Sequence, residues 1–235
     1  MGKTTGFHLF LFAMLGMPLT GHGQSAGTAE VRFRLSLSRA SSHSSPPAVI
    51  WLKPLQQAST PAAPAQGRFT LLQKNRMFVP HLLVIPVGSE VQFPNADPFF
   101  HNVFSLFDGK RFDLGLYEAG SSKGVIFSRE GISYIFCNIH PEMSAVVVAL
   151  TTPFYAIANS SGNFEVRDAP PGDYELHVWV EGVSQPVLKG FTRRVHLAGG
   201  TNDLGSFDVA MIKQHPAEHL NEFGQPYDRN SKSRY

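Results

Sequence analysis

The sequence predicts an all-β protein that contains two small β-sandwich or β-barrel modules. Its apolar segments are short and rich in β-branched and aromatic residues, and 21 glycines and 17 prolines among the 235 residues separate them. No segment shows the periodicity of an amphipathic helix of three turns or more. The formal net charge of +2, without a basic tract, gives no indication of nucleic-acid binding.

Residues 1–23 have the composition of a secretory signal peptide. Lys3 supplies a positive charge, an apolar run follows at 7–17, and small residues precede an expected cleavage near Gly23. The apolar run is too short to span a bilayer comfortably, and no later segment approaches a membrane span. We therefore expect a soluble mature chain that is exported or secreted, most simply to a bacterial periplasm.

The first strands of the mature chain are expected within residues 24–55. Apolar and polar residues alternate from Glu30 to Ser38, which is typical of a half-buried strand, and Ala48–Leu52 predicts a second strand. His43 lies between them in a polar loop, where a solvated residue is a simpler interpretation than a ligand. Residues 56–67 are rich in Pro, Ala and Gln and indicate a linker.

Residues 68–150 are expected to form the next module. Short β-branched or aromatic segments predict its strands at Phe69–Leu72, Leu82–Ile85, Glu90–Phe93, Val103–Phe107, Val125–Phe127, Ile132–Cys137 and Ala145–Leu150. Polar residues 115–124 are expected to form a loop. The last two strands flank residues 138–143, so buried strands hold both ends of that short loop.

The loop from Cys137 to Met143 concentrates metal-binding side chains. It holds the only cysteine of the chain together with His140 and Met143, and His101 is the best-placed histidine to complete the set. One thiolate, two imidazoles and a weak axial thioether are the ligands of a blue-copper electron-transfer site. An exported chain normally pairs its cysteines, so this one needs another role, either metal binding or an intermolecular disulfide.

Each of these residues also has an ordinary structural explanation. A lone buried cysteine is usually a small apolar residue, a loop histidine is usually bonded to its neighbours, and a methionine usually belongs to a core. A tetrahedral zinc site is a further alternative, although structural zinc sites use more Cys and His and no Met. The coincidence of all four residues with flanking strands favours copper.

The motifs of this module resemble the cupredoxins, the type 1 blue copper proteins, and are most similar to plastocyanin- and amicyanin-like members. The residues that carry the resemblance are Phe78–Asn95, His101, Asn102, Cys137, His140, Pro141 and Met143. The resemblance implies a Greek-key β-barrel or sandwich with one copper ion held by the two histidines, the cysteine and the methionine. It also implies that Asn102 braces the two ligand loops and that Pro141 limits the freedom of the second loop.

A docking surface for a redox protein is expected beside the ligands. We expect the edge of the His140 ring to reach the surface and His101 to be more enclosed. The apolar residues expected around that edge are Ile139, Pro141, Phe99 and Phe100. Exposed apolar patches mark partner sites, although these side chains could equally pack beneath the loop.

Residues 151–212 carry two further motifs. Asn159–Phe164 matches a D/N-x-x-G-x-F turn, and Pro170–Tyr174 matches a P-P-G-x-Y corner. Both resemble the carboxypeptidase regulatory-like, or transthyretin-like, β-sandwich, whose members are usually structural or binding modules. That fold begins with a strand pair, which we expect residues 24–55 to supply, so that 68–150 is an insertion. Residues 213–235, with His215 and His219, are expected to be a disordered tail.

The sequence therefore predicts a periplasmic type 1 copper protein that carries single electrons between redox protein partners. The alternatives are a copper-binding module for copper delivery, storage or enzyme assembly without redox shuttling, and a structural β-protein with a vestigial site. We expect no enzyme and no small-molecule substrate, because multicopper enzymes need a further copper centre with its own histidines. No His-x-His pair or dense histidine motif occurs in the chain.

Overall fold

The computed structural model describes residues 27–38, 45–56, 65–106 and 109–210, and the single residues Gly2, Asn221, Phe223 and Gln225. The expected signal peptide apart from Gly2, His43, the middle of the expected linker, and His215 and His219 of the expected tail lie outside the described residues. Within them, strands dominate and the one helix is α1 (Gln185–Phe191), which confirms the all-β prediction. No helix in the described ranges is long and apolar enough to cross a membrane.

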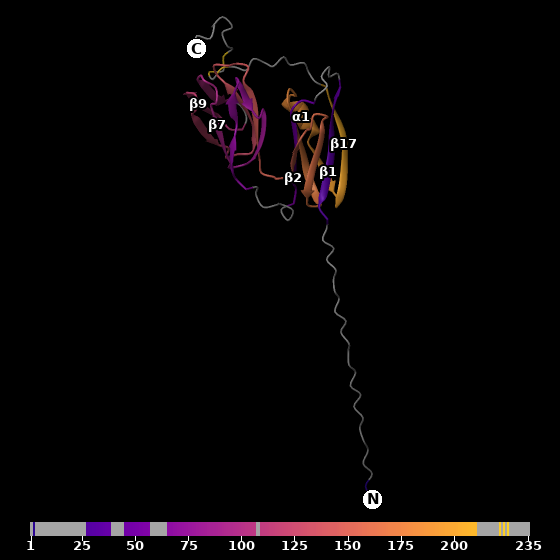
Figure 1. The fold of residues 1–235 in the computed structure, drawn as a ribbon. Coiled ribbons are helices and arrows are strands. Elements are labelled where there is room, and N and C mark those ends of the chain that lie inside the picture. The colour runs from indigo at the N-terminus through magenta and orange to yellow at the C-terminus, as the bar shows by residue number, and fades with distance from the viewer. Residues whose placement is uncertain are drawn as a thin grey trace.

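Residues 68–150 form two sheets and a hairpin (Figure 1). The larger sheet has the strand order β6-β12-β11-β8-β9, and the smaller sheet has the order β10-β7-β3. Two neighbouring pairs, β6 with β12 and β3 with β7, are parallel. The strands are β3 (Arg68–Thr70), β4 (Leu72–Lys74), β5 (Met77–Val79), β6 (Leu82–Pro86), β7 (Glu90–Pro94), β8 (His101–Ser105), β9 (Phe112–Tyr117), β10 (Ser122–Ile126), β11 (Gly131–Cys137) and β12 (Ser144–Leu150).

A single apolar core fills the space between these two sheets. Val91 and Phe93 of β7 pack in the same buried cluster as Ile135 of β11 and Val147 of β12. Cys137 and Met143 belong to this cluster as well. The expected ligand loop is therefore anchored at both ends in a close-packed interior, which limits its movement.

The expected loop at 115–124 is wrong, because most of this segment belongs to β9 and β10. Residues 122–124 of β10 are exposed and polar, so no alternation of apolar side chains marks them as a strand. Their backbone nevertheless pairs with β7, where Ser122 lies opposite Pro94 and Gly124 opposite Gln92. Backbone hydrogen bonding to a neighbour, rather than side-chain pattern, determines this edge strand.

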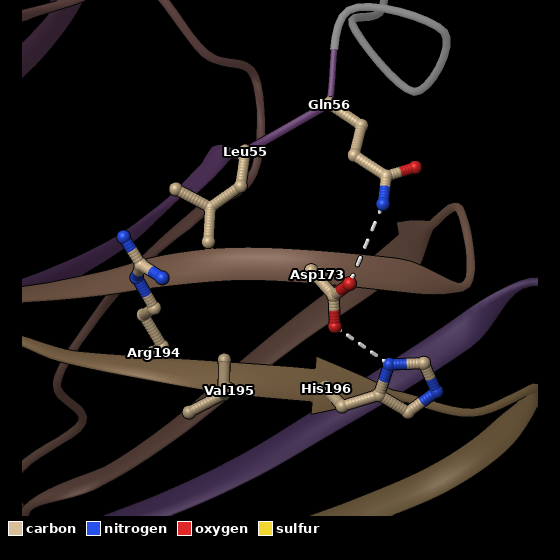
Figure 2. Close-up of a pocket in the computed structure, with 6 residues that line it drawn as sticks. All are labelled: Leu55, Gln56, Asp173, Arg194, Val195 and His196. Atoms are coloured by element: carbon tan, nitrogen blue, oxygen red, sulfur yellow. Dashed lines mark hydrogen bonds and ion pairs between the residues drawn. The ribbon is translucent and has the colours of Figure 1, made fainter.

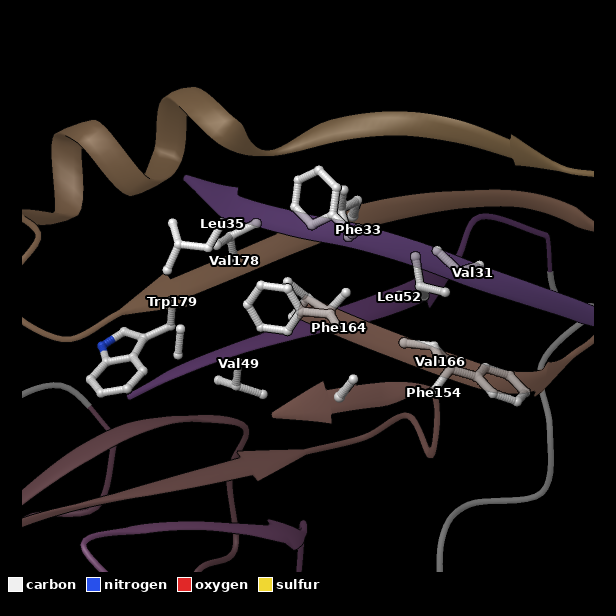
Figure 3. Packing of buried hydrophobic residues seen from close by; sticks show 14 of the residues in the cluster. Val31, Phe33, Leu35, Val49, Leu52, Phe154, Phe164, Val166, Val178 and Trp179 are labelled. Carbon is white, nitrogen blue, oxygen red and sulfur yellow. The ribbon is translucent and has the colours of Figure 1, made fainter. Parts of the chain in front are cut away.

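The remaining strands form a second sandwich of two sheets. One has the order β14-β1-β17 and the other β13-β2-β15-β16, and Figure 3 shows side chains from both meeting in one core. In β1, Val31, Phe33 and Leu35 are buried while Arg32 and Arg34 are exposed, which confirms the predicted alternation. The elements are β1 (Ala29–Ser38), β2 (Ala48–Pro54), β13 (Tyr155–Ile157), β14 (Asn163–Ala169), β15 (Gly172–Val180), β16 (Arg193–Leu197) and β17 (Gly200–Ala210).

The two C-terminal motifs form a turn and a corner. Asn159 Oδ1 accepts hydrogen bonds from the backbone N–H groups of Ser161 and Asn163, both at 3.0 Å. Gly162 has φ 77°, and a Cβ there would lie 2.6 Å from Leu35 O, so the turn requires glycine. The Tyr174 hydroxyl donates to Pro170 O at 2.7 Å and closes the corner.

The N-terminal strands complete both sheets of the second sandwich. β1 lies between β14 and β17, and β2 lies between β13 and β15. The two ends of the intervening segment meet at one turn, since Gly67 O accepts from Glu90 N and Leu150 O accepts from Val87 N, each at 2.9 Å. We propose on this basis that residues 68–150 are an insertion within the second sandwich.

The two sandwiches share a contact region. Val84, Val146 and Leu150 of the first sandwich belong to the same buried cluster as Trp179 of the second. The Trp179 Nε1–H group donates to the Tyr134 hydroxyl at 3.2 Å. Apolar packing thus joins the modules.

Polar bridges also cross the contact region. Lys53 Nζ lies 2.9 Å from Glu130 Oε2. His81 Nε2 lies 2.6 Å from Glu181 Oε1, and its Nδ1 lies 3.0 Å from Ser144 O. Both partners of the His81 ring are acceptors, so the imidazolium, which donates from both nitrogens, satisfies them best. The hydrogen bond to Glu181 accordingly raises the pKa of His81.

The proposed insertion predicts how fragments behave. A fragment of residues 151–235 lacks β1 and β2, so each of its sheets loses an internal strand. We expect this fragment to show no cooperative thermal transition by circular dichroism, whereas a fragment of residues 68–150 should unfold cooperatively. A cooperative transition in the 151–235 fragment would contradict the insertion.

The His81–Glu181 pair predicts a pH-dependent contribution to stability. Because the folded-state pKa of His81 is raised, the contribution is fully present below pH 6.5, the ordinary His value, and is lost as the pH rises through the raised pKa. Both side chains are more than a third exposed, so Glu181→Gln should cost at most about 1 kcal/mol at low pH. Urea unfolding of the metal-free protein and this variant at pH 5.5 and pH 9 measures the difference. An equal cost at both values would show that the pair does not act as an ion pair.

Candidate metal centre

Strand pairing brings the first two side chains of the centre together. His101 is the first residue of β8, and Cys137 is the last residue of β11. The two strands are antiparallel neighbours, and Cys137 lies opposite Val103. The end of one strand and the start of the other therefore meet at the same end of the sheet.

The short loop between β11 and β12 supplies the third side chain. Met143 N–H donates to His140 O at 2.9 Å, and Cys137 N–H donates to Met143 O at 3.3 Å. Asn138 N–H also donates to Asn102 O at 3.2 Å, which ties the loop to β8. These backbone bonds fold the loop back toward the end of β11 and fix the position of His140 within it.

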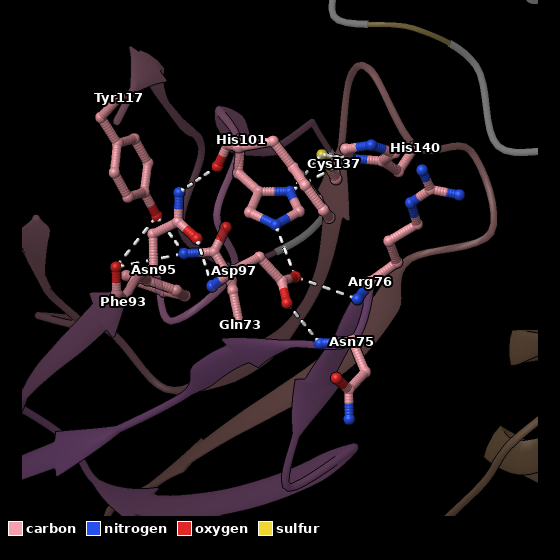
Figure 4. Close-up of polar contacts among 11 residues, drawn as sticks. Gln73, Asn75, Arg76, Phe93, Asn95, Asp97, His101, Tyr117, Cys137 and His140 are labelled. Carbon is pink, nitrogen blue, oxygen red and sulfur yellow. Dashed lines mark hydrogen bonds and ion pairs between the residues drawn. The ribbon is translucent and has the colours of Figure 1, made fainter. Parts of the chain in front are cut away.

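The three side chains converge on one point. Cys137 Sγ lies 3.6 Å from His101 Nδ1 and 3.6 Å from His140 Nδ1, and the two Nδ1 atoms are 3.1 Å apart (Figure 4). Ligand atoms 2.0–2.3 Å from a shared metal ion, at angles near 110–120°, lie roughly 3.3–3.8 Å from one another. The observed distances fit such an ion with small adjustments. Among the described residues, this is the one group of three or more His, Cys, Asp or Glu side chains found in such an arrangement.

The surroundings of Cys137 suit a thiolate that is bound to a cation. Burial raises the pKa of the Cys137 thiol, while the backbone N–H groups of Asn102, Ile139 and His140 bond to the sulfur and oppose that shift. The thiol is therefore protonated at neutral pH when no cation is near. A bound cation displaces the proton, and the three N–H groups then stabilise the resulting charge.

The two histidines differ in exposure as predicted. His101 is fully buried, while His140 is partly exposed. Burial, followed by the nearby His101 ring, lowers the pKa of His140. The His140 ring is accordingly neutral at neutral pH, which leaves a nitrogen lone pair free for a metal ion.

The Phe99 ring packs beside the centre. The Phe99 ring contacts both imidazoles, at centroid distances of 5.3 Å from His101 and 5.4 Å from His140. The guanidinium of Arg76 lies over the Phe99 ring, 5.3 Å from its centroid. Phe100 is 54% exposed. Ile139 and Pro141 are each half-buried, and Ile139 also packs against the core cluster that contains Cys137.

The structure gives Asn102 and Met143 less direct positions. The Asn102 side chain donates to Asp113 Oδ1 at 2.8 Å, while its backbone O accepts from Asn138 N of the Cys137 loop at 3.2 Å. Its Oδ1 is buried and has no hydrogen-bond partner among the described residues. Met143 is buried and packs in the core cluster beside Cys137. The role of Met143 as a ligand stays a prediction.

Asp97 is a residue of the centre that the sequence did not reveal. Its buried carboxylate lies 2.9 Å from His101 Nε2 and accepts hydrogen bonds from the backbone N–H groups of Asn75 and Arg76 (Figure 4). Burial alone raises the pKa of Asp97, but the bonds from Arg76, His101 and Asn75 together outweigh it and lower the pKa. The only signal in the sequence was an acidic residue four positions before His101, which many loops contain by chance.

A polar network holds the loop that carries Asp97. Asn95 Oδ1 accepts from Asp97 N at 3.0 Å, and Asn95 Nδ2 donates to Phe99 O at 2.7 Å. Beneath it, the Tyr117 hydroxyl donates to Phe93 O at 3.0 Å and accepts from Gln73 Nε2. Burial raises the pKa of Tyr117 far above its usual value, so the hydroxyl remains a donor. The loop between β7 and β8 is thus fixed on both sides.

Two other described histidines and an open surface hollow belong to the second sandwich. His177 Nε2 lies 2.7 Å from Glu175, and His196 Nδ1 lies 2.7 Å from Asp173. His196 and Asp173 line an open hollow of about 450 Å³ on the second sandwich (Figure 2). Its polar residues bond to one another, with Gln56 Nε2 3.5 Å from Asp173 Oδ2. These histidines therefore have carboxylate partners of their own, outside the group that includes Cys137.

No model of a known protein family matches the chain, and no curated protein matches it. Among solved structures, a purple cupredoxin from Nitrosopumilus maritimus is 25% identical, with a TM-score of 0.32, over 36% of this chain and 100% of that one. A copper-containing nitrite reductase from Thermus scotoductus SA-01 is 23% identical, with a TM-score of 0.34, over 42% of this chain and 25% of that one. A reduced amicyanin variant is 20% identical, with a TM-score of 0.34, over 37% of this chain and 85% of that one. Because all three TM-scores lie below 0.5, the proposals that follow rest on the geometry of the centre itself.

Proposed function

We propose that this chain is an exported type 1 copper protein that carries single electrons between redox protein partners. His101, Cys137 and His140 would hold one copper ion, with Met143 as a weak axial ligand. The observation that supports this proposal is the convergence of His101 Nδ1, Cys137 Sγ and His140 Nδ1 within 4.8 Å of one another. One thiolate and two imidazoles are the ligands of blue-copper sites.

The surrounding fold suits electron transfer because it keeps the ligands in place. Cys137 and His101 sit on paired strands, and the Cys137–Met143 loop is closed by its own backbone bonds. Copper supplies a one-electron couple when it is bound. A rigid ligand set changes little between the two charge states, so little reorganisation accompanies each transfer. Four protein ligands also leave no open position for a substrate, so we propose a carrier and not an enzyme.

The partly exposed His140 ring is the proposed route for electrons. Ile139 and Pro141 flank it on the loop, and the Phe99 ring contacts it. The exposed ring of Phe100 adds apolar surface next to Phe99. We propose that these residues form a docking surface for a redox protein, since transient electron-transfer encounters use small interfaces.

Copper loading tests the proposed centre. The protein should bind one Cu(II) per chain with an intense visible thiolate-to-copper band, and Cys137→Ser should abolish the band completely because no other cysteine exists. Met143→Leu should keep the band and raise the reduction potential, because a weak donor to the copper is lost. Titration followed by visible spectroscopy and cyclic voltammetry measures both effects.

Three results would contradict this assignment. A visible band that survives Cys137→Ser would exclude the proposed thiolate ligand. An unchanged potential in Met143→Leu would place Met143 in the core only. Fast transfer of copper to a chelator, without a reversible one-electron wave, would favour copper delivery or storage over electron transfer.

A charge placed on the proposed docking surface should slow electron exchange. Ile139→Lys should leave the copper spectrum unchanged but slow electron exchange between two copies of the protein at least about fivefold, the effect of roughly 1 kcal/mol at an interface centre. Ile126→Lys is the matched control, because Ile126 is 57% exposed and lies at the end of β10 opposite Glu90, away from the Pro94 end that leads to the centre. Equal exchange rates in the two variants would exclude the His140 surface as the electron route.

A further inference from the structure

Asp97 connects the metal centre to a hairpin turn 22 residues earlier in the chain. Its Oδ1 accepts from Asn75 N at 2.6 Å, and its Oδ2 accepts from Arg76 N at 3.0 Å. The same Oδ2 lies 2.9 Å from His101 Nε2. Asp97 and His101 are 5% and 0% exposed, so water does not compete effectively for these bonds.

The turn itself is shaped to present two donors. Lys74 pairs with Met77 across β4 and β5, which leaves Asn75 and Arg76 as a two-residue turn. Both have positive φ values, 57° and 53°, as in a type I′ hairpin turn. Left-handed backbone at two successive residues turns both N–H groups toward the same carboxylate, so the position of Asp97 is fixed before any ligand binds.

This arrangement determines which nitrogen of His101 carries the proton. Asp97 can only accept when it is ionised, so His101 Nε2 must donate to it. In the neutral ring the proton then resides on Nε2, and Nδ1 keeps its lone pair. Nδ1 is the atom that faces Cys137 Sγ and His140 Nδ1. The carboxylate thus orients the ring and leaves the correct nitrogen available for a metal ion.

We infer that Asp97 is a positioning residue, which holds His101 in its metal-binding tautomer and favours Cu(II) over Cu(I) through its buried negative charge. The inference rests on the proposed copper function and adds to it a residue outside the ligand set. A carboxylate bonded to the distal nitrogen of a ligand histidine raises the basicity of the ring, and its loss typically costs 10–100-fold in metal affinity. The added negative charge stabilises the more positive ion, so the reduction potential should fall when Asp97 is present.

Asp97→Asn tests the inference, and Glu142→Gln is the matched control. Glu142 is exposed, and its charge acts on both Cys137 and His140, yet it bonds to neither ligand ring in the structure. Asp97→Asn should weaken Cu(II) binding about tenfold or more, with a smaller effect on Cu(I). A tenfold change in the ratio of the two affinities raises the potential by about 59 mV. Glu142→Gln removes the same charge and should change both quantities much less.

A measurement on the metal-free protein separates this inference from the copper function. Nitrogen-15 NMR of the wild-type protein should show His101 in the Nε2–H tautomer, with slow exchange of that proton, and Asp97→Asn should lose the slow exchange. A wild-type His101 protonated on Nδ1 would overturn the inference even if copper binds. This measurement needs only the wild-type protein, so it does not depend on the folding of a variant. Equal affinities and potentials in Asp97→Asn and Glu142→Gln would also overturn it. Failure of the wild type to give a blue copper band, with the tautomer as expected, would instead overturn the proposed function.

Discussion

The antiparallel pairing of β8 with β11 is the contact on which the metal centre depends. It places residues 36 positions apart in the chain, His101 and Cys137, within 3.6 Å of each other. The loop that follows Cys137 needs only six further residues to place Met143 back in the same core. Slipping that register by one residue would turn Cys137 out of the core, because successive side chains of a strand point to opposite faces.

The centre is surrounded by supports that come from several distant segments. Asp97, which is bonded to the Asn75–Arg76 turn, fixes His101 through its Nε2, and Phe99 packs against both imidazoles. Behind the sheet, Trp179 and Tyr134 join the first sandwich to the second. Residues from several distant segments therefore support the proposed ligands. The geometry of the centre depends on all of these contacts and not on one loop.

The sequence allowed prediction wherever a local pattern was sufficient. The alternation in β1 and the all-β class follow from local side-chain pattern, and the spacing of Cys137 and His140 is visible within four residues. Asp97 could not be recognised, because its importance arises from backbone donors of Asn75 and Arg76 that only the folded hairpin brings to it. The first half of β10 was missed for a related reason, since residues 122–124 are held by backbone pairing with β7 and carry no apolar signal.

The nested order of the strands has a consequence for how the chain folds as it is made. β1 pairs with β14 and β17, and Ala29 lies opposite Ala169 and Gly200. The backbone hydrogen bonds of β1 can therefore form only after these C-terminal residues have been synthesised. The first sandwich contains its own sheet partners, and closing its shorter loops costs less entropy. It can therefore fold first, while β1 and β2 remain open edges able to pair with other chains. Once formed, the first sandwich holds Gly67 and Leu150 at one turn. The N-terminal strands then lie near the C-terminal ones, so the chain between β2 and β13 acts as a short loop when the second sandwich forms.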